Sequence, residues 1–238
     1  MVVTISRLGY AKTQPLEVYQ SQRRGGVGKT AASVKEEDFV EQLIVANTHD
    51  TLLCFSNLGK VYWLKVYEIP QASRVAKGRP LVNLIQLDSE ERITSLLNVE
   101  SFDAAGFVFM ATMKGVVKKT PLEDFRLPRK NGKRAIKLDA KDELVGTKIT
   151  DGKQHIMLIS DAGKAVYFDE KDSRPLGRDT RGVKGIELED EQNVISLMVP
   201  GSEDEILTVS ENGFGKKSRI TDFRKTKRGA KGVIAMQL

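Results

Sequence analysis

The chain repeats one pattern of apolar and polar positions five times. Each copy opens on an apolar run, continues with Ser or Thr and two further residues, and closes on Gly. The copies start near residues 2, 52, 107, 156 and 206, and their closing glycines are Gly9, Gly59, Gly115, Gly163 and Gly213. Because these glycines are spaced 50, 56, 48 and 50 residues apart, the pattern predicts an array of similar modules.

A second glycine recurs in four of the five copies, with a basic residue four positions ahead of it. The pairs are Arg24 and Gly28, Arg74 and Gly78, Arg181 and Gly185, and Arg228 and Gly232, while the third copy has Arg129 and Lys133. An acidic stretch follows, as in Glu187–Glu191, and then another apolar run, as in Val194–Val199. Short apolar runs separated by Gly, Asp, Asn and Lys turns predict a small antiparallel sheet in every copy.

One stretch has a competing interpretation. Phe39, Leu43 and Ala46 have helical spacing within residues 36–47, but the equivalent stretches of the other copies resemble strands, so we predict a strand here as well. Four-stranded sheets that recur at this period are typical of propeller-like folds. We therefore expect a single all-β, propeller-like domain over residues 1–238.

Composition restricts the chemistry that this fold can carry. The 238 residues include one cysteine and two histidines. Cys54 lies in an apolar run, so we expect a buried thiol in a reducing cytoplasm. His49 and His155 stand in polar turns without a Cys/His cluster, so we expect no metal site and no cofactor. No apolar run is long enough to span a membrane and no signal peptide opens the chain, so we expect an intracellular protein with no membrane partner.

Charge is segregated within the repeat. The chain has 38 basic and 32 acidic residues, a formal charge of +6, and residues 114–137 and 216–231 hold nine and eight of the basic ones. A single basic cluster is usually a solvated face, but recurrence at one phase of a repeat predicts a continuous basic rim. Duplex DNA is the natural partner for such a rim.

The predicted rim residues share this phase or flank it, and we expect them to be exposed. They are Lys12, Lys29, Lys60, Lys65, Arg74, Lys77, Arg79, Lys118, Lys119, Arg129, Lys133, Arg134, Arg178, Arg181, Lys184, Lys216, Lys217, Arg228 and Lys231.

Residues Arg24–Thr30 resemble a phosphate-binding P-loop without meeting its requirements. The position five before Gly28 is Arg23, and the polar stretch Glu17–Arg23 does not fit the buried strand that such a loop needs. The same phase in other copies lacks the Lys-Thr pair. An ATPase is therefore the less favoured interpretation, although a glycine-rich basic loop can still bind the phosphates of a nucleic acid.

The residues of this loop carry a family resemblance. Gln22, Arg23, Arg24, Gly25, Gly26, Val27 and Gly28 form a segment that resembles the seven-residue box of the C-terminal domain of DNA gyrase A. Flanking segments such as Gly9–Lys12, Lys35–Phe39 and Val45–Asp50 are also similar to that family. The resemblance implies a β-pinwheel of five to six four-stranded blades that exchange strands, with DNA bent around a basic rim and the box as part of the DNA-binding site.

The resemblance also implies partners and a location. These are duplex DNA, the N-terminal part of gyrase A and the whole of gyrase B, in a cytoplasmic, nucleoid-associated enzyme that introduces negative supercoils. The DNA-cleaving tyrosine would lie outside this chain, because Tyr10, Tyr19, Tyr62, Tyr67 and Tyr167 all fall within the repeats. The chain itself is therefore expected to be non-catalytic.

Two departures from the family pattern leave alternatives open. Val27 stands where the box is usually basic, and five copies of the repeat are present where gyrase domains usually have six. We therefore expect a truncated last blade. The C-terminal domain of the related topoisomerase IV protein, which has fewer blades and no clear box, and a propeller-like protein-interaction scaffold remain the alternatives.

Overall fold

The computed structural model describes residues 1–19 and 38–237. These residues form strands β1 to β18 and six short 3-10 turns, η1 to η6, with no α-helix among them, so the prediction of an all-β fold is confirmed. The chain divides into two compact units. Unit 1 contains Met1–Ser56, Val61–Ser101 and Pro128–Lys133, and unit 2 contains Asn57–Lys60, Phe102–Leu127 and Arg134–Leu238.

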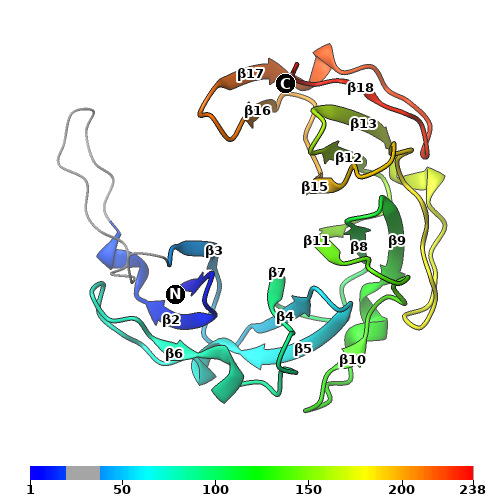
Figure 1. Ribbon diagram of the computed structural model, residues 1–238. Helices are drawn as coiled ribbons and strands as arrows, with labels where there is room; N and C mark the ends of the chain where they lie inside the picture. Colours follow the sequence, from blue (N-terminus) through cyan, green and yellow to red (C-terminus); the bar gives the residue numbers. More distant parts are fainter. Residues whose placement is uncertain (20–37, 238) are drawn as a thin grey trace. The chain divides into compact units, whose positions relative to one another are not determined.

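The first sheet of unit 1 has the strand order β3-β1-β2-β6, with antiparallel pairs throughout (Figure 1). Its strands are β1 (Val2–Ser6), β2 (Tyr10–Gln14), β3 (Val40–Val45) and β6 (Arg79–Pro80). Strand β3 confirms the strand prediction over the helical alternative for Val40–Val45. Strand β6 belongs to the second copy of the repeat, so the blade is completed by a strand from the following copy.

The second sheet has the order β10-β5-β4-β7. Its strands are β4 (Thr51–Ser56), β5 (Lys60–Lys65), β7 (Ile93–Val99) and β10 (Lys133–Arg134), and the 3-10 turns of unit 1 are η1 (Leu16–Val18), η2 (Val66–Glu68) and η3 (Leu81–Asn83). Strand β10 comes from the third copy, which repeats the strand exchange of the first sheet.

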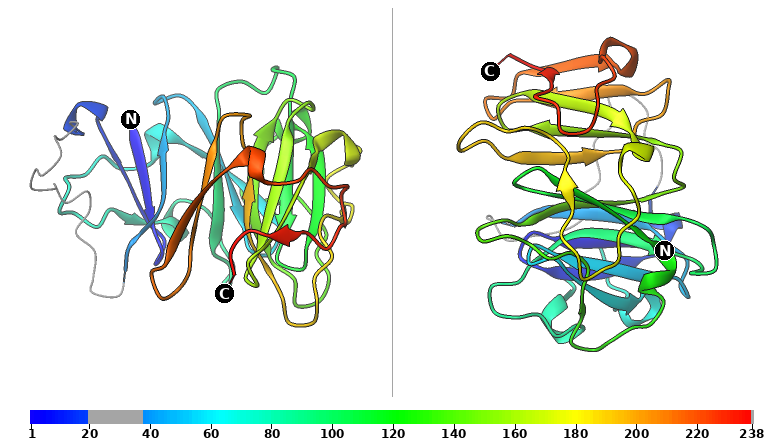
Figure 2. Two further views of the ribbon diagram at one scale, coloured as in Figure 1. Left: turned by 90° about the horizontal axis from the view of Figure 1, so that it is seen from above. Right: turned by 90° about the vertical axis from the view of Figure 1, so that its right-hand side faces the viewer.

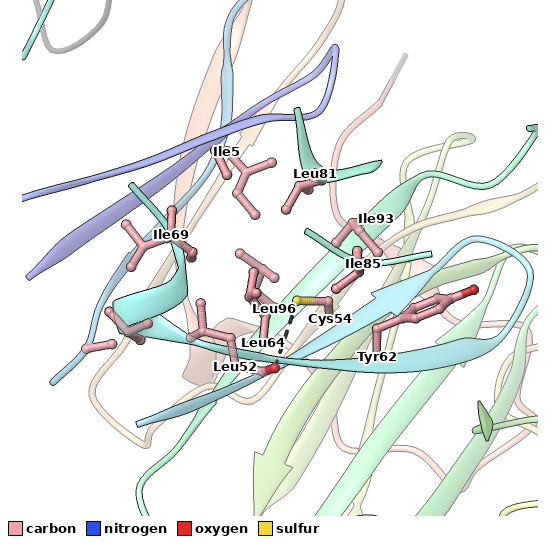
Figure 3. Close-up of a cluster of buried hydrophobic side chains, with 14 residues drawn as sticks. Ile5, Leu52, Cys54, Tyr62, Leu64, Ile69, Leu81, Ile85, Ile93 and Leu96 are labelled. Carbon is pink, nitrogen blue, oxygen red and sulfur yellow. Dashed lines mark hydrogen bonds between the residues drawn. The ribbon is translucent and has the colours of Figure 1, made fainter. Parts of the chain in front are cut away.

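The core of unit 1 is a cluster of apolar side chains from these two sheets (Figure 3). Ile5, Leu52 and Leu64 are within it, and each exposes less than a tenth of its surface. Cys54 is fully buried there, as predicted, and its Sγ lies 3.9 Å from the Leu52 carbonyl oxygen. Burial raises the pKa of the Cys54 thiol to about 12, so the thiol stays protonated and acts as a small apolar side chain.

Unit 2 contains three sheets. The first two have the orders β11-β8-β9-β14 and β15-β12-β13-β18, and the third pairs β16 with β17 (Figures 1 and 2). The strands are β8 (Phe107–Thr112), β9 (Val116–Pro121), β11 (Leu144–Thr150), β12 (His155–Ser160), β13 (Lys164–Asp169), β14 (Val183–Lys184), β15 (Val194–Met198), β16 (Glu205–Val209), β17 (Gly215–Arg219) and β18 (Val233–Ile234). Its 3-10 turns are η4 (Leu122–Phe125), η5 (Glu170–Asp172) and η6 (Ile220–Asp222).

Two apolar clusters hold the sheets of unit 2 together. One includes Phe109, Leu158 and Phe168, all with no exposed surface. The other joins Tyr167 to Ile220 and neighbouring residues of the last sheet. Strands β14 and β18 come from the fourth and fifth copies, so strand exchange continues through unit 2.

The glycine of the second pattern is explained by this exchange. Gly78 immediately precedes β6 and has a φ of +90°, and a Cβ atom there would lie 2.3 Å from the Ala11 carbonyl oxygen of β2. Gly232, before β18, has a φ of +81°, and its Cβ would lie 2.7 Å from the Ala165 carbonyl oxygen. Only glycine allows the chain to cross the neighbouring strand this closely.

We expect Gly78→Ala to destabilise the protein more than Gly9→Ala. Both residues have positive φ, but a Cβ at Gly9 would meet nothing within 4 Å. Gly9→Ala should therefore cost only the strain of the left-handed backbone, about 1–2 kcal/mol, whereas Gly78→Ala should add about 1–3 kcal/mol for overpacking. Urea unfolding followed by circular dichroism measures both, and equal losses would contradict this explanation.

Candidate nucleic-acid interface

The predicted rim residues differ widely in exposure. The exposed ones are Lys77, Arg79, Arg129, Arg134, Arg181, Lys184, Lys216, Lys217 and Lys231. The half-buried ones are Lys60, Lys65, Arg74, Lys133, Arg178 and Arg228. The buried ones are Lys12, Lys118 and Lys119. The box residues Gln22, Arg23, Arg24, Gly25, Gly26, Val27 and Gly28, together with Lys29, lie outside the described residues.

Lys12 does not lie on an exposed rim, so that expectation is wrong. Its side chain on β2 is only 2% exposed. The ammonium group donates to three backbone carbonyls of the crossing loop that leads to β6, those of Ser73 at 3.1 Å, Arg74 at 2.8 Å and Ala76 at 2.9 Å. The loop covers the lysine and uses its charge to satisfy carbonyls that would otherwise be unpaired.

Lys118 occupies the equivalent position in unit 2, and the expectation that it is exposed is also wrong. It has no exposed surface, and its Nζ donates to the carbonyls of Ala135 at 2.8 Å, Arg178 at 2.5 Å and Thr180 at 3.1 Å. Burial lowers the pKa of the Lys118 amine to about 8, and the nearby Asp179 carboxylate opposes that shift. The ammonium thus joins two loops that flank β9.

A signal for these burials exists in the comparison of the copies with one another. Lys12 and Lys118 stand three residues after the first glycine, where the second and fourth copies have Tyr62 and Val166. Both of these are buried, and Tyr62 donates its hydroxyl to Glu91 Oε2 at 2.6 Å. A position that accepts Tyr and Val faces a covered surface, so its lysines are structural.

Lys119 also contradicts the expectation of exposure, because it is 4% exposed. Its Nζ lies 3.6 Å from Glu170 Oε1, and Glu170 has no exposed surface. Glu170 opens η5, while the corresponding first residues of the other turns are apolar: Leu16, Val66, Leu122 and Ile220. The pair is therefore a buried ionic contact at a place where the other copies are apolar on the η side.

Two arginines of the second pattern bind backbone. The guanidinium of Arg74 donates to the carbonyl of Val18, the last residue of η1. In unit 2, Arg228 Nε donates to the carbonyl of Asp172, the last residue of η5, at 3.1 Å. Each arginine thus ties its crossing loop to the turn of the preceding copy, a role that sequence reasoning missed.

The exposed cations are partly neutralised by carboxylates of unit 2. Arg181 lies 3.0 Å from Asp139, and Arg134 lies 4.0 Å from Asp179. Lys217 pairs with Glu205 on the adjacent strand. In unit 1, half-buried Lys133 stands 5.7 Å from the ring centroid of Trp63, a cation–π contact.

Some acidic residues of the third pattern cap the turns after the first glycine run. Asp38 accepts from the backbone N–H of Leu8 at 3.0 Å, and Asp142 accepts from that of Lys114 at 2.8 Å. Both carboxylates are at least nine-tenths buried. Structural use of these acids leaves the basic residues to dominate the crossing loops.

Phosphate binding is the chemistry that these side chains can perform. No group of three or more His, Cys, Asp or Glu side chains within residues 1–19 and 38–237 could hold a metal ion. Within the same residues, no helix has the length and apolar character needed to cross a membrane. Exposed guanidinium and ammonium groups bind the oxyanions of a nucleic acid backbone.

Comparison with known proteins gives one family along the chain. The family model of the DNA gyrase C-terminal domain, a beta-propeller, matches residues 1–47, 50–100, 106–151, 154–200 and 204–238.

A relative in Klebsiella oxytoca, the A protein of DNA gyrase, is 49% identical over 238 residues, which are 100% of this chain and 27% of the relative. The chain thus spans about a quarter of that relative. Among solved structures, the C-terminal domain of DNA topoisomerase IV matches with a TM-score of 0.81 and 30% identity, over 98% of this chain and 71% of that one. The C-terminal domain of DNA gyrase A matches with a TM-score of 0.80 and 28% identity, over 98% and 75%.

We expect the Lys119–Glu170 pair to be costly to break and cheap to replace. Lys119→Met or Glu170→Leu alone should lower the free energy of unfolding by about 3–5 kcal/mol, because each leaves an uncompensated buried charge. The double variant should recover most of this loss, since two apolar side chains can pack as in the other copies. Urea unfolding of the four proteins gives the coupling energy, and additive losses would contradict this assignment.

Proposed function

Because the chain belongs to the family of DNA gyrase C-terminal domains, we propose that it binds duplex DNA along its basic crossing loops and bends it. Binding is independent of base sequence, and the bend lets the complete enzyme introduce negative supercoils. The chain contributes no catalytic group to that reaction. Its partners are duplex DNA, the N-terminal part of gyrase A and the whole of gyrase B, in the bacterial cytoplasm at the nucleoid.

One observation carries the proposal: an exposed cation accompanies each described outer strand. These cations are Arg79 in β6, Arg134 in β10, Lys184 in β14 and Lys231 just before β18. Strand exchange places one such cation in every completed sheet, and a row of cations neutralises successive phosphates. The proposal therefore rests on the outer strands, and the buried lysines have no part in it.

The alternatives are less well supported. A P-loop ATPase requires a parallel sheet with a following helix, while every pair of neighbouring strands with a described register is antiparallel. The topoisomerase IV domain has almost the same TM-score as the gyrase domain, so the family match and the gyrase A relative favour gyrase. A protein-interaction scaffold would not need a cation at each outer strand.

Binding to duplex DNA should weaken steeply with salt. If about eight phosphates are neutralised, the slope of log K against log salt concentration should be near −7. Lys184→Ala should lower affinity modestly and reduce the slope by about one, while Lys148→Ala, an exposed lysine on β11, is the matched control. Fluorescence anisotropy with duplexes of equal length and different sequence measures both. A slope near zero, or strong preference for one sequence, would overturn the proposed function.

The box is assigned to the bend. Bending a duplex of 20–30 base pairs costs about 1–6 kcal/mol, and the consecutive arginines Arg23 and Arg24 are proposed to supply the contacts that close it. Replacing both by Ala should leave most of the straight-duplex affinity and abolish the bend, measured by energy transfer between the ends of a long duplex. In the complete enzyme, supercoiling should be lost while relaxation and cleavage remain. Normal end-to-end transfer in the double variant would reject this role.

A further inference from the structure

Two basic loops of unit 2 are fixed against each other. Residues 134–139 lead away from β10, and residues 178–184 lead into β14. The backbone N–H of Lys137 donates to the Thr180 carbonyl at 3.1 Å. Beneath them, the Lys118 ammonium binds carbonyls of both loops, Ala135 in the first and Thr180 in the second. The relative position of the loops is therefore set without DNA.

Above this support, each loop contributes one arginine and one aspartate to a crossed pair. Arg181 NH1 lies 3.0 Å from Asp139 Oδ1, and Arg134 NH1 lies 4.0 Å from Asp179 Oδ1. All four side chains are solvent-accessible, with exposed fractions of 63% and 56% in the first pair and 58% and 73% in the second. Both arginines are among the cations predicted to meet DNA.

Exposed ion pairs of this kind are easily exchanged. Water and salt screen them, so their net contribution to stability is small. A guanidinium group binds carboxylates and phosphates in the same two-pronged geometry. The carboxylates of Asp139 and Asp179 therefore lie where phosphate oxygens of a bound duplex would be placed.

We propose that Asp139 and Asp179 are internal competitors of DNA, which occupy Arg181 and Arg134 until duplex phosphates replace them. The inference rests on the proposed function and adds a specific role for two acidic residues. In the free protein the aspartates hold the guanidinium groups in orientation above the Lys118 support. In the complex they lose these partners, so affinity is lower than the cations alone would give, and DNA is released more readily.

The Arg181–Asp139 pair gives the sharper test, because Asp179 also acts on the Lys118 amine. Asp139→Asn keeps the shape of the side chain and removes its charge. Removing any acid raises DNA affinity slightly, so Asp190→Asn, at an exposed position of the same unit, is the matched control. Anisotropy titrations with a long duplex at low salt compare these variants with the unaltered chain, and thermal melting checks that all remain folded.

We expect Asp139→Asn to lower Kd by about two- to fivefold relative to Asp190→Asn, the range of an exposed ion pair. In an Arg181→Ala background, the gain from Asp139→Asn should disappear, because the competitor then has nothing to release. Equal effects of Asp139→Asn and Asp190→Asn, or a gain that persists without Arg181, would overturn the inference while leaving the proposed function intact. Absence of duplex binding by the unaltered chain would overturn both.

Discussion

Strand exchange is the constraint on which the rest of this structure depends. The outer strand of each four-stranded sheet comes from the following copy of the repeat, so every crossing loop must pass over a hairpin that formed from earlier sequence. Gly78 and Gly232 permit that close passage, because a Cβ at either would collide with a strand carbonyl. The loop also brings backbone carbonyls over the hairpin, and these need donors because they are removed from water. Lys12 and Lys118 supply those donors from below.

The same loops separate two uses of basic residues. Their inner side consumes charge: buried lysines satisfy carbonyls, and Arg74 and Arg228 hold the preceding 3-10 turns. Their outer side presents cations such as Arg79 and Lys184 to solvent. Net positive charge is therefore a poor measure of the surface available to DNA, since part of it stabilises the loops that display the remainder. The proposed DNA-binding function and the stability of the fold draw on neighbouring residues of one segment.

Acidic residues complete this division of labour. Asp38 and Asp142 are buried caps of hairpin turns, while Asp139 and Asp179 stay exposed beside arginines. Buried carboxylates that accept backbone N–H bonds support local geometry, and exposed ones act on the surface potential. A rim that must release DNA as well as bind it benefits from exposed carboxylates, because they limit affinity without altering the backbone of the loops.

The sequence by itself determined the repeat, the all-β class, the strand at Val40–Val45 and the buried Cys54, because each follows from local patterning reinforced by five copies. It also placed Arg79, Arg134 and Lys184 correctly on an exposed surface. It could not decide the fate of Lys12, Lys118 and Lys119, which belong to the same basic phase. On an antiparallel strand, alternation tells which residues share a face, but not what covers that face. For Lys12 the cover is a loop more than 60 residues away in sequence, for Lys118 it is two loops, and for Lys119 it is Glu170 of another sheet. Only the tertiary structure brings these partners together, and burial of a charge is decided by its partners.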